Sequence, residues 1–140
     1  MKQFEIKKIG EDEWELKSLV NTNSMKFKRD VKLAKGIQEI TPNARLKMIK
    51  FLKEKDMTKD DLIEKKVKNG KIIYDETAYR ELENGFIRDE TINFTYELFN
   101  LVFGKTPEDL AAYLGITNEE ESNRLGVEIG KTFRLKKGEQ

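Results

Sequence analysis

The sequence predicts an α+β fold, with a mainly helical body and a small N-terminal antiparallel β-hairpin or sheet. Apolar residues alternate with polar ones through residues 1–28, which is the period of a strand. From residue 30 to residue 125, capping residues instead precede apolar residues at helical spacing. No linker rich in Pro, Gly or Ser divides the chain, so we expect one globular domain over residues 1–135. Residues 136–140 are expected to form a flexible tail.

The N-terminal strands are predicted from a polar turn at residues 10–12. Alternating apolar residues flank this turn on both sides: Phe4, Ile6, Trp14 and Leu16. Such a pattern is typical of two antiparallel strands joined by a tight connection. Met25 and Phe27 repeat the alternation and predict a third short strand.

Three helices are expected in the first half of the body. Asp30 is placed to cap a helix that reaches Ile40, and Thr41-Pro42 is a typical start for the next helix. Thr58 repeats the capping pattern and predicts a charged helix that ends near Asn69-Gly70. The second of these helices has a broad apolar face formed by Leu46, Met48, Ile49, Phe51 and Leu52. Its other face carries three lysines that are candidate partner-binding residues: Lys47, Lys50 and Lys53.

The segment after residue 70 leads to the most apolar part of the chain. Residues 71–74 fit either a short strand or a docking segment, and Asp75 predicts a short helix closed by Asn84-Gly85. Residues 92–103 then form a helix with an apolar arc of roughly 220°, wider than the stripe of about 100° on a surface helix. This helix is either central to the core or also presents a groove to a partner, and its candidate partner-binding residues are Ile92, Tyr96, Phe99 and Phe103.

The C-terminal quarter contains two more predicted helices. Gly104 ends the aromatic helix, and Thr106-Pro107 starts a short helix that Gly115 ends. Thr117 is the expected cap of an acidic helix that ends at Leu125-Gly126. Alternating apolar residues after that point predict a final strand or an extended tail: Val127, Ile129, Phe133 and Leu135.

The sequence contains neither Cys nor His. Disulfides, thiolate nucleophiles, Ser-His-Asp triads and metal sites built on Cys or His are therefore excluded. We expect a non-enzymatic protein with no catalytic residue, no cofactor and no bound metal. No run of about 18 apolar residues predicts a membrane span, and no signal-peptide pattern is present, so we expect a cytoplasmic location.

Two sequence patterns resemble parts of catalytic sites. Gly104-Lys105-Thr106 and Gly130-Lys131-Thr132 match the end of a phosphate-binding loop, but neither has the required glycine upstream. Paired carboxylates, such as Asp60-Asp61 and Glu108-Asp109, lie mostly in first helical turns, where negative charge is favoured. Helix boundaries therefore explain both patterns better than catalysis does.

The net charge of +1 hides a segregated distribution. Residues 26–73 contain 15 basic and 7 acidic side chains, whereas residues 75–121 contain 3 basic and 12 acidic ones. This pattern fits two solvated faces, internal pairing of the two halves, or head-to-tail self-association. We do not expect binding to nucleic acid, because the acidic half would repel phosphates and the basic half has few arginines and no interleaved aromatic residues.

The order of these parts resembles a family of phage proteins. The hairpin at residues 4–16 leads to MKFKRD at 25–30, and the aromatic helix ends in LFNLVFG at 98–104 before TPEDL at 106–110. This arrangement resembles the tail assembly chaperones of long-tailed bacteriophages and prophages of Gram-positive hosts. The resemblance spans most of the chain but rests on length, order and composition rather than on an invariant motif.

The resemblance implies a cytoplasmic, non-enzymatic factor that is not retained in the mature virion. Its expected partners are the phage tape measure protein, which it would keep soluble, and the tail tube protein, which it would recruit. Self-association is also expected. Two other functions remain open, namely a small DNA-binding regulatory protein and a phage connector or neck component.

Overall fold

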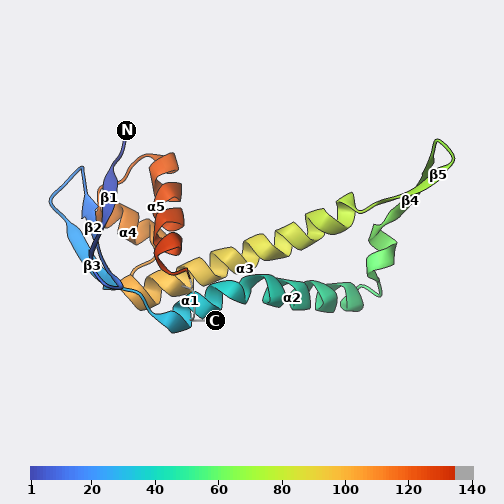
Figure 1. The fold of residues 1–140 in the computed structure, drawn as a ribbon, viewed down its shortest axis with the longest axis horizontal. Coiled ribbons are helices and arrows are strands. Elements are labelled where there is room, and N and C mark those ends of the chain that lie inside the picture. Colours follow the sequence, from blue (N-terminus) through green and yellow to red (C-terminus); the bar gives the residue numbers. More distant parts are fainter. Residues whose placement is uncertain (135–140) are drawn as a thin grey trace. The chain divides into compact units, whose positions relative to one another are not determined.

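The computed structural model describes residues 1–134, so Leu135 and the tail expected at residues 136–140 lie outside the described residues. Five α-helices, a three-stranded sheet and a two-stranded sheet make up the described chain, which confirms the α+β fold (Figure 1). Among these residues, no helix combines the length and the apolar character needed to cross a membrane. The expected single domain divides into two compact units. Unit 1 contains residues 1–37 and the chain from residue 93 onward, and unit 2 contains residues 38–92.

Unit 1 begins with the predicted strands. β1 (Phe4–Gly10), β2 (Glu13–Ser18) and β3 (Ser24–Lys28) form an antiparallel sheet in the order β1-β2-β3. In its register Ile6 lies opposite Leu16, and Trp14 lies opposite Phe27. The N-terminal hairpin and the third strand are therefore confirmed.

Helices cover this sheet and build the core of unit 1. They are α1 (Val31–Gln38), the C-terminal part of α3 (Thr77–Phe103), α4 (Pro107–Tyr113) and α5 (Glu119–Thr132). The Phe27 ring contacts the Phe103 ring at 5.1 Å and the Phe133 ring at 6.1 Å between centroids, which joins the sheet to α3 and to the end of α5. The buried cluster consists of Phe4, Leu16, Phe27, Leu98, Phe99, Phe103, Leu110, Ala111, Leu114, Ile116, Leu125, Ile129 and Phe133.

Unit 2 is a helical pair with a β-ribbon. α2 (Ile40–Glu54) buries Ala44, Met48 and Leu52, which recur every four residues along one stripe. The Phe51 and Phe86 rings lie 5.6 Å apart and join α2 to the N-terminal part of α3. A short 3₁₀ turn, η1 (Lys59–Leu62), then leads into the antiparallel strands β4 (Glu64–Lys68) and β5 (Lys71–Asp75).

The prediction of a charged helix after Thr58 is wrong beyond the first turn of that helix. Thr58 forms the expected capping box with Asp61, but only η1 follows it. Asn69 and Gly70 have φ angles of 54° and 75°, which are the left-handed values that a two-residue hairpin turn requires. They join β4 to β5 instead of ending a helix, and residues 71–74 form a strand.

Four predicted helix boundaries also need correction. α2 starts at Ile40 with no side-chain cap, so Thr41-Pro42 lies inside its first turn. α3 continues through Asn84-Gly85, because the packing of α2 against it favours an unbroken helix over the local stop signal. Asn118, rather than Thr117, caps α5 by accepting hydrogen bonds from the Glu120 and Glu121 amides. α5 then continues through Gly126 to Thr132, so the expected final strand is wrong over these residues. Ile129 and Phe133 are buried four residues apart, as on a helix, whereas Val127 is exposed.

The remaining capping residues and helix-ending glycines agree with the sequence, although α1 ends at Gln38 rather than at Ile40. Asp30 accepts a hydrogen bond from the Lys32 amide at the start of α1, and Thr106 accepts one from Asp109 at the start of α4. Gly104 and Gly115 have φ angles of 65° and 70° at the ends of α3 and α4. These are the left-handed conformations that favour glycine after a helix.

Candidate functional site

The aromatic helix supplies fewer accessible side chains than its sequence suggested. Phe99 and Phe103 are buried in the core of unit 1, where they contribute to folding. Ile92 and Tyr96 are 48% and 40% exposed, so only these two of the four candidates reach the surface. The Tyr96 hydroxyl donates a hydrogen bond to Glu108, which raises the pKa of Tyr96 and lowers that of Glu108.

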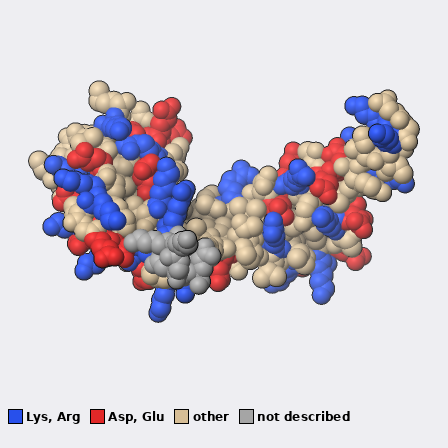
Figure 2. Space-filling view, in the orientation of Figure 1, with Lys and Arg blue, Asp and Glu red and all other residues tan. Residues whose placement is uncertain are grey.

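The basic and acidic parts of the chain meet inside unit 2. Arg45 on α2 lies 3.4 Å from Glu83 on α3, and Lys47 forms an ion pair with Glu90. Part of the segregated charge therefore pairs internally, and Figure 2 shows basic and acidic side chains interspersed over the helices of this unit. Lys50 and Lys53, the other two lysines of the predicted face, are exposed.

An apolar groove lies where α2 ends. The Asp56 amide donates to the Lys53 carbonyl at 3.1 Å and the Met57 amide donates to the Leu52 carbonyl at 2.8 Å. This pair of bonds is a Schellman motif, which turns the chain so that Met57 returns towards Leu52. The backbone of Asp56 adopts a φ of 55° to make this turn.

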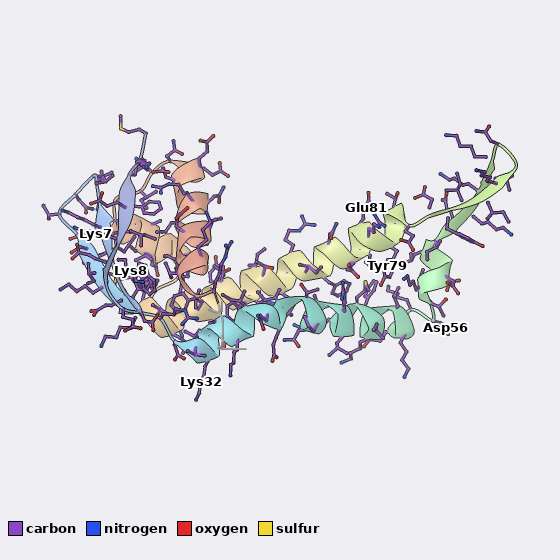
Figure 3. The ribbon with its side chains drawn as sticks, in the orientation of Figure 1. Lys7, Lys8, Lys32, Asp56, Tyr79 and Glu81 are labelled. Carbon is purple, nitrogen blue, oxygen red and sulfur yellow. The ribbon has the colours of Figure 1, made fainter. Side chains whose placement is uncertain are left out.

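The groove has a volume of about 560 Å³ and an apolar floor. Figure 3 shows Asp56 and Tyr79 at the ends of α2 and α3 that border it. The Lys59 ammonium lies 4.7 Å from the centroid of the Tyr79 ring and holds η1 against the start of α3. The lining residues are Met48, Ile49, Leu52, Lys53, Asp56, Met57, Thr58, Lys59 and Tyr79.

This groove is not among the sites that the sequence predicts. The sequence places Met48, Ile49 and Leu52 on one apolar face, but of these three only Met48 and Leu52 are buried, and Ile49 is 58% exposed. The missing information was the chain reversal at Asp56, for which no glycine provided a signal. An apolar residue, Met57, directly before the Thr58 cap was the available indication, because such a residue often packs back onto a helix.

The β4–β5 ribbon is the second exposed apolar feature of unit 2. Val67, Ile72 and Tyr74 are 73%, 55% and 63% exposed, and the strand register places all three on one face. Lys66 lies on the opposite face and donates a hydrogen bond to Asp75 at 2.9 Å. Asp75 also accepts from the Thr77 side chain and amide, and these hydrogen bonds hold the pKa of its carboxyl well below the usual range.

Within residues 1–134, the sequence patterns that resemble parts of catalytic sites lie at helix boundaries or inside helices. No group of three or more Asp or Glu side chains among residues 1–134 is arranged to hold a metal ion. Gly104 ends α3, and Gly130 lies inside α5, so neither Gly-Lys-Thr sequence forms a phosphate-binding loop. Asp61 takes part in the capping box of η1, and Glu108 and Asp109 lie in the first turn of α4.

Comparison with protein-family models, with curated proteins and with solved structures finds no match to this chain.

Proposed function

We propose that this protein is a non-enzymatic phage tail assembly chaperone, which binds the tape measure protein and promotes assembly of the tail tube. The observation that supports this proposal best is the open apolar groove at the end of α2, because amphipathic helices bind in hydrophobic grooves. In this proposal the protein acts in the bacterial cytoplasm and is absent from the mature virion.

The groove suits an amphipathic helix. A tape measure protein is a long helical chain whose apolar stripes would aggregate when uncovered, so a chaperone for it needs an accessible apolar surface. Met48 and Met57 give the groove an adaptable wall, because the unbranched methionine side chain adjusts to different partners. Lys53 and Lys59 border the groove and favour a helix with acidic residues beside its apolar stripe.

The test is co-expression with a phage tape measure protein. The soluble fraction of the tape measure protein is measured, together with its co-purification with the tagged chain. We expect the wild-type chain to raise the soluble fraction, and Ile49→Asp to abolish both effects by placing a charge in the groove. Leu46→Asp is the matched control, because Leu46 is 65% exposed on the same helix but does not line the groove. Equal losses in both variants would contradict the role of the groove.

Two alternative functions give different outcomes. A DNA-binding regulatory protein would be retained on heparin or non-specific DNA, with a steep loss of retention as salt is raised. A connector or neck component would remain in purified phage particles, whereas the proposed chaperone would be absent from them.

A further inference from the structure

We propose that two copies of this chain associate through β5, whose outer edges pair antiparallel across a two-fold axis to form a four-stranded sheet. This self-association does not depend on the proposed chaperone function. It rests on three features of β5: its open edge, the backbone groups that it directs away from β4, and the pattern of charges along the strand.

The ribbon leaves the outer edge of β5 unpaired within the described chain. Among residues 1–134, β5 pairs only with β4, and the two strands form a sheet of their own (Figure 1). A two-stranded ribbon is marginally stable in water, and an open strand edge is a template for pairing with another chain. Ile72, Ile73 and Tyr74 are all more than 45% exposed, so this strand lacks the apolar cover that most strands have.

The register of the hairpin sets which backbone groups face outward. Lys68 and Lys71 flank the two-residue turn and lie opposite each other. In such a hairpin this pair exchanges backbone hydrogen bonds, and bonded pairs then alternate with non-bonded pairs along the ribbon. Lys71, Ile73 and Asp75 therefore direct their backbone groups toward β4, whereas Ile72 and Tyr74 direct theirs toward the free edge.

An antiparallel pairing centred on Ile73 uses all of these outward groups. It places Ile72 opposite Tyr74 of the second copy, and the two residues exchange both backbone hydrogen bonds. Symmetry repeats this pair, so four hydrogen bonds form around a central non-bonded pair of Ile73 residues.

The charges along β5 are complementary to themselves in this same register. The strand reads Lys-Ile-Ile-Tyr-Asp, so its antiparallel copy places Lys71 opposite Asp75 of the second chain at both ends. Opposite charges across strands are stabilising, and Ile facing Tyr is a favourable aliphatic–aromatic pair. The pairing also brings a carboxylate to Lys71, which within one copy lies opposite the like-charged Lys68.

The edge of β4 is less complementary to itself. β4 reads Glu-Lys-Lys-Val-Lys, so antiparallel pairing about its centre places Glu64 opposite Lys68 at both ends but Lys66 opposite Lys66 in the middle, and the strand has an excess of positive charge where β5 has none. Like charges directly opposite each other are destabilising. The charge pattern therefore selects β5 as the shared edge and leaves β4 outermost in the four-stranded sheet.

The association also extends the apolar face of the ribbon. Val67, Ile72 and Tyr74 share one face in each copy, and residues that lie opposite each other across antiparallel strands keep the same face. The two faces therefore join into one strip across four strands, in which Ile72 of each copy lies beside Tyr74 of the other.

Disulfide cross-linking of the full-length chain tests the register, because the sequence has no cysteine of its own. We expect Ile73→Cys to form a disulfide-linked dimer under mild oxidation, since side chains of a non-bonded pair have Cβ atoms about 4.5–5.5 Å apart, close to the disulfide spacing. Val67→Cys is the matched control, because Val67 is also exposed but lies on β4, away from the axis. Equal cross-linking of the two variants, or none in Ile73→Cys, would overturn the proposal.

Sedimentation velocity over a concentration series tests the charge pattern without cysteines. We expect the wild-type chain to dimerise and Lys71→Glu to weaken the dimer on the order of tenfold, because both Lys71–Asp75 pairs become repulsive. Lys68→Glu makes the same change of net charge on β4 and should leave the dimer intact. A wild-type chain that stays monomeric at every concentration, or equal weakening by the two variants, would rule out pairing through β5.

Discussion

The guanidinium group of Arg124 lies 3.8 Å from the centroid of the Phe4 ring, and its Nη2 atom donates a hydrogen bond to the Phe4 carbonyl at 2.9 Å. The same guanidinium pairs with Glu121, whose carboxylate accepts a 2.6 Å hydrogen bond from the backbone amide of Gln3. Arg124 on α5 therefore anchors β1 directly through the ring and the carbonyl of Phe4. It also holds the Glu121 carboxylate, which binds the residue before β1. Its contacts span more than 100 residues of sequence and join β1 to α5 within unit 1.

Arg124→Ala should destabilise the protein by about 2–3 kcal/mol. The substitution removes the cation over Phe4 and leaves the largely buried Glu121 carboxylate without its charged partner. Urea unfolding followed by circular dichroism measures the loss. Lys131→Ala is the control, because Lys131 also pairs with a glutamate three residues away on α5 but is exposed, so its loss should be below about 0.5 kcal/mol. Similar losses for the two variants would contradict an anchoring role for Arg124.

The stability of the protein should fall as the pH is lowered from 4.5 towards 2. Hydrogen bonding to Arg124 lowers the pKa of Glu121 from 4.5 to about 2 in the folded chain. A carboxyl with a lowered folded-state pKa stabilises the fold fully above its unfolded-state pKa, and this contribution disappears as the pH falls through the folded-state value. The urea midpoint at pH 7, 4.5, 3.5 and 2.5 measures the effect.

Glu121→Gln should flatten this pH dependence without abolishing it. Asp75 and Glu108 also have lowered pKa values, so their protonation continues to destabilise the variant. Glu120→Gln is the matched control, because Glu120 is the exposed neighbour of Glu121 in the first turn of α5. If the urea midpoint of Glu121→Gln fell with pH as steeply as that of the wild-type chain, other carboxyl groups would be responsible for the loss of stability in acid.

Alanine substitutions at two helical glycines should change the stability of the protein in opposite directions. A Cβ atom at Gly36 in α1 would lie 2.6 Å from Cε2 of Phe94, whereas a Cβ at Gly126 in α5 meets no atom within 4 Å. Gly36→Ala should therefore cost about 1–3 kcal/mol through overpacking. Gly126→Ala should stabilise the protein by about 1 kcal/mol, because alanine is the better helix former.

Thermal unfolding of both glycine variants measures the difference. A stabilising effect of Gly36→Ala would mean that the Phe94 ring moves aside at little cost. The double variant Gly36→Ala/Phe94→Leu separates the two contributions, because the shorter side chain should remove the clash while retaining most of the apolar contact.

The sequence predicted the parts of the fold that depend on local patterns. Alternation around the turn at residues 10–12 was enough to predict β1 and β2, and Thr106-Pro107 marked the start of α4. The prediction failed where tertiary packing overrides a local signal, as at Gly85 and Gly126, which both lie inside helices. It also failed at Asn69-Gly70, where a turn dipeptide between lysine-rich segments was interpreted as the end of a helix.

The candidate site was less predictable than the fold. The aromatic helix was correctly identified as apolar, but the sequence alone did not separate the buried Phe99 from the exposed Ile92. Which residues of such a helix are buried depends on how its neighbours pack on it, and that information is not local. The groove likewise depends on a chain reversal at Asp56 that brings residues from three segments together.

Asp56→Gly should stabilise the protein by about 0.5–1 kcal/mol, because glycine adopts the left-handed conformation at this position with less strain. Asp56 has a φ of 55° and ends α2 through the bonds of the Asp56 and Met57 amides to Lys53 and Leu52. The substitution keeps both bonds and removes only the side chain. Asp60→Gly is the control, because Asp60 lies in the 3₁₀ turn that follows and its backbone is not left-handed, so glycine there should destabilise. Urea unfolding measures both variants. A loss of stability in Asp56→Gly would show that the carboxylate at the edge of the groove contributes more to folding than the backbone strain costs.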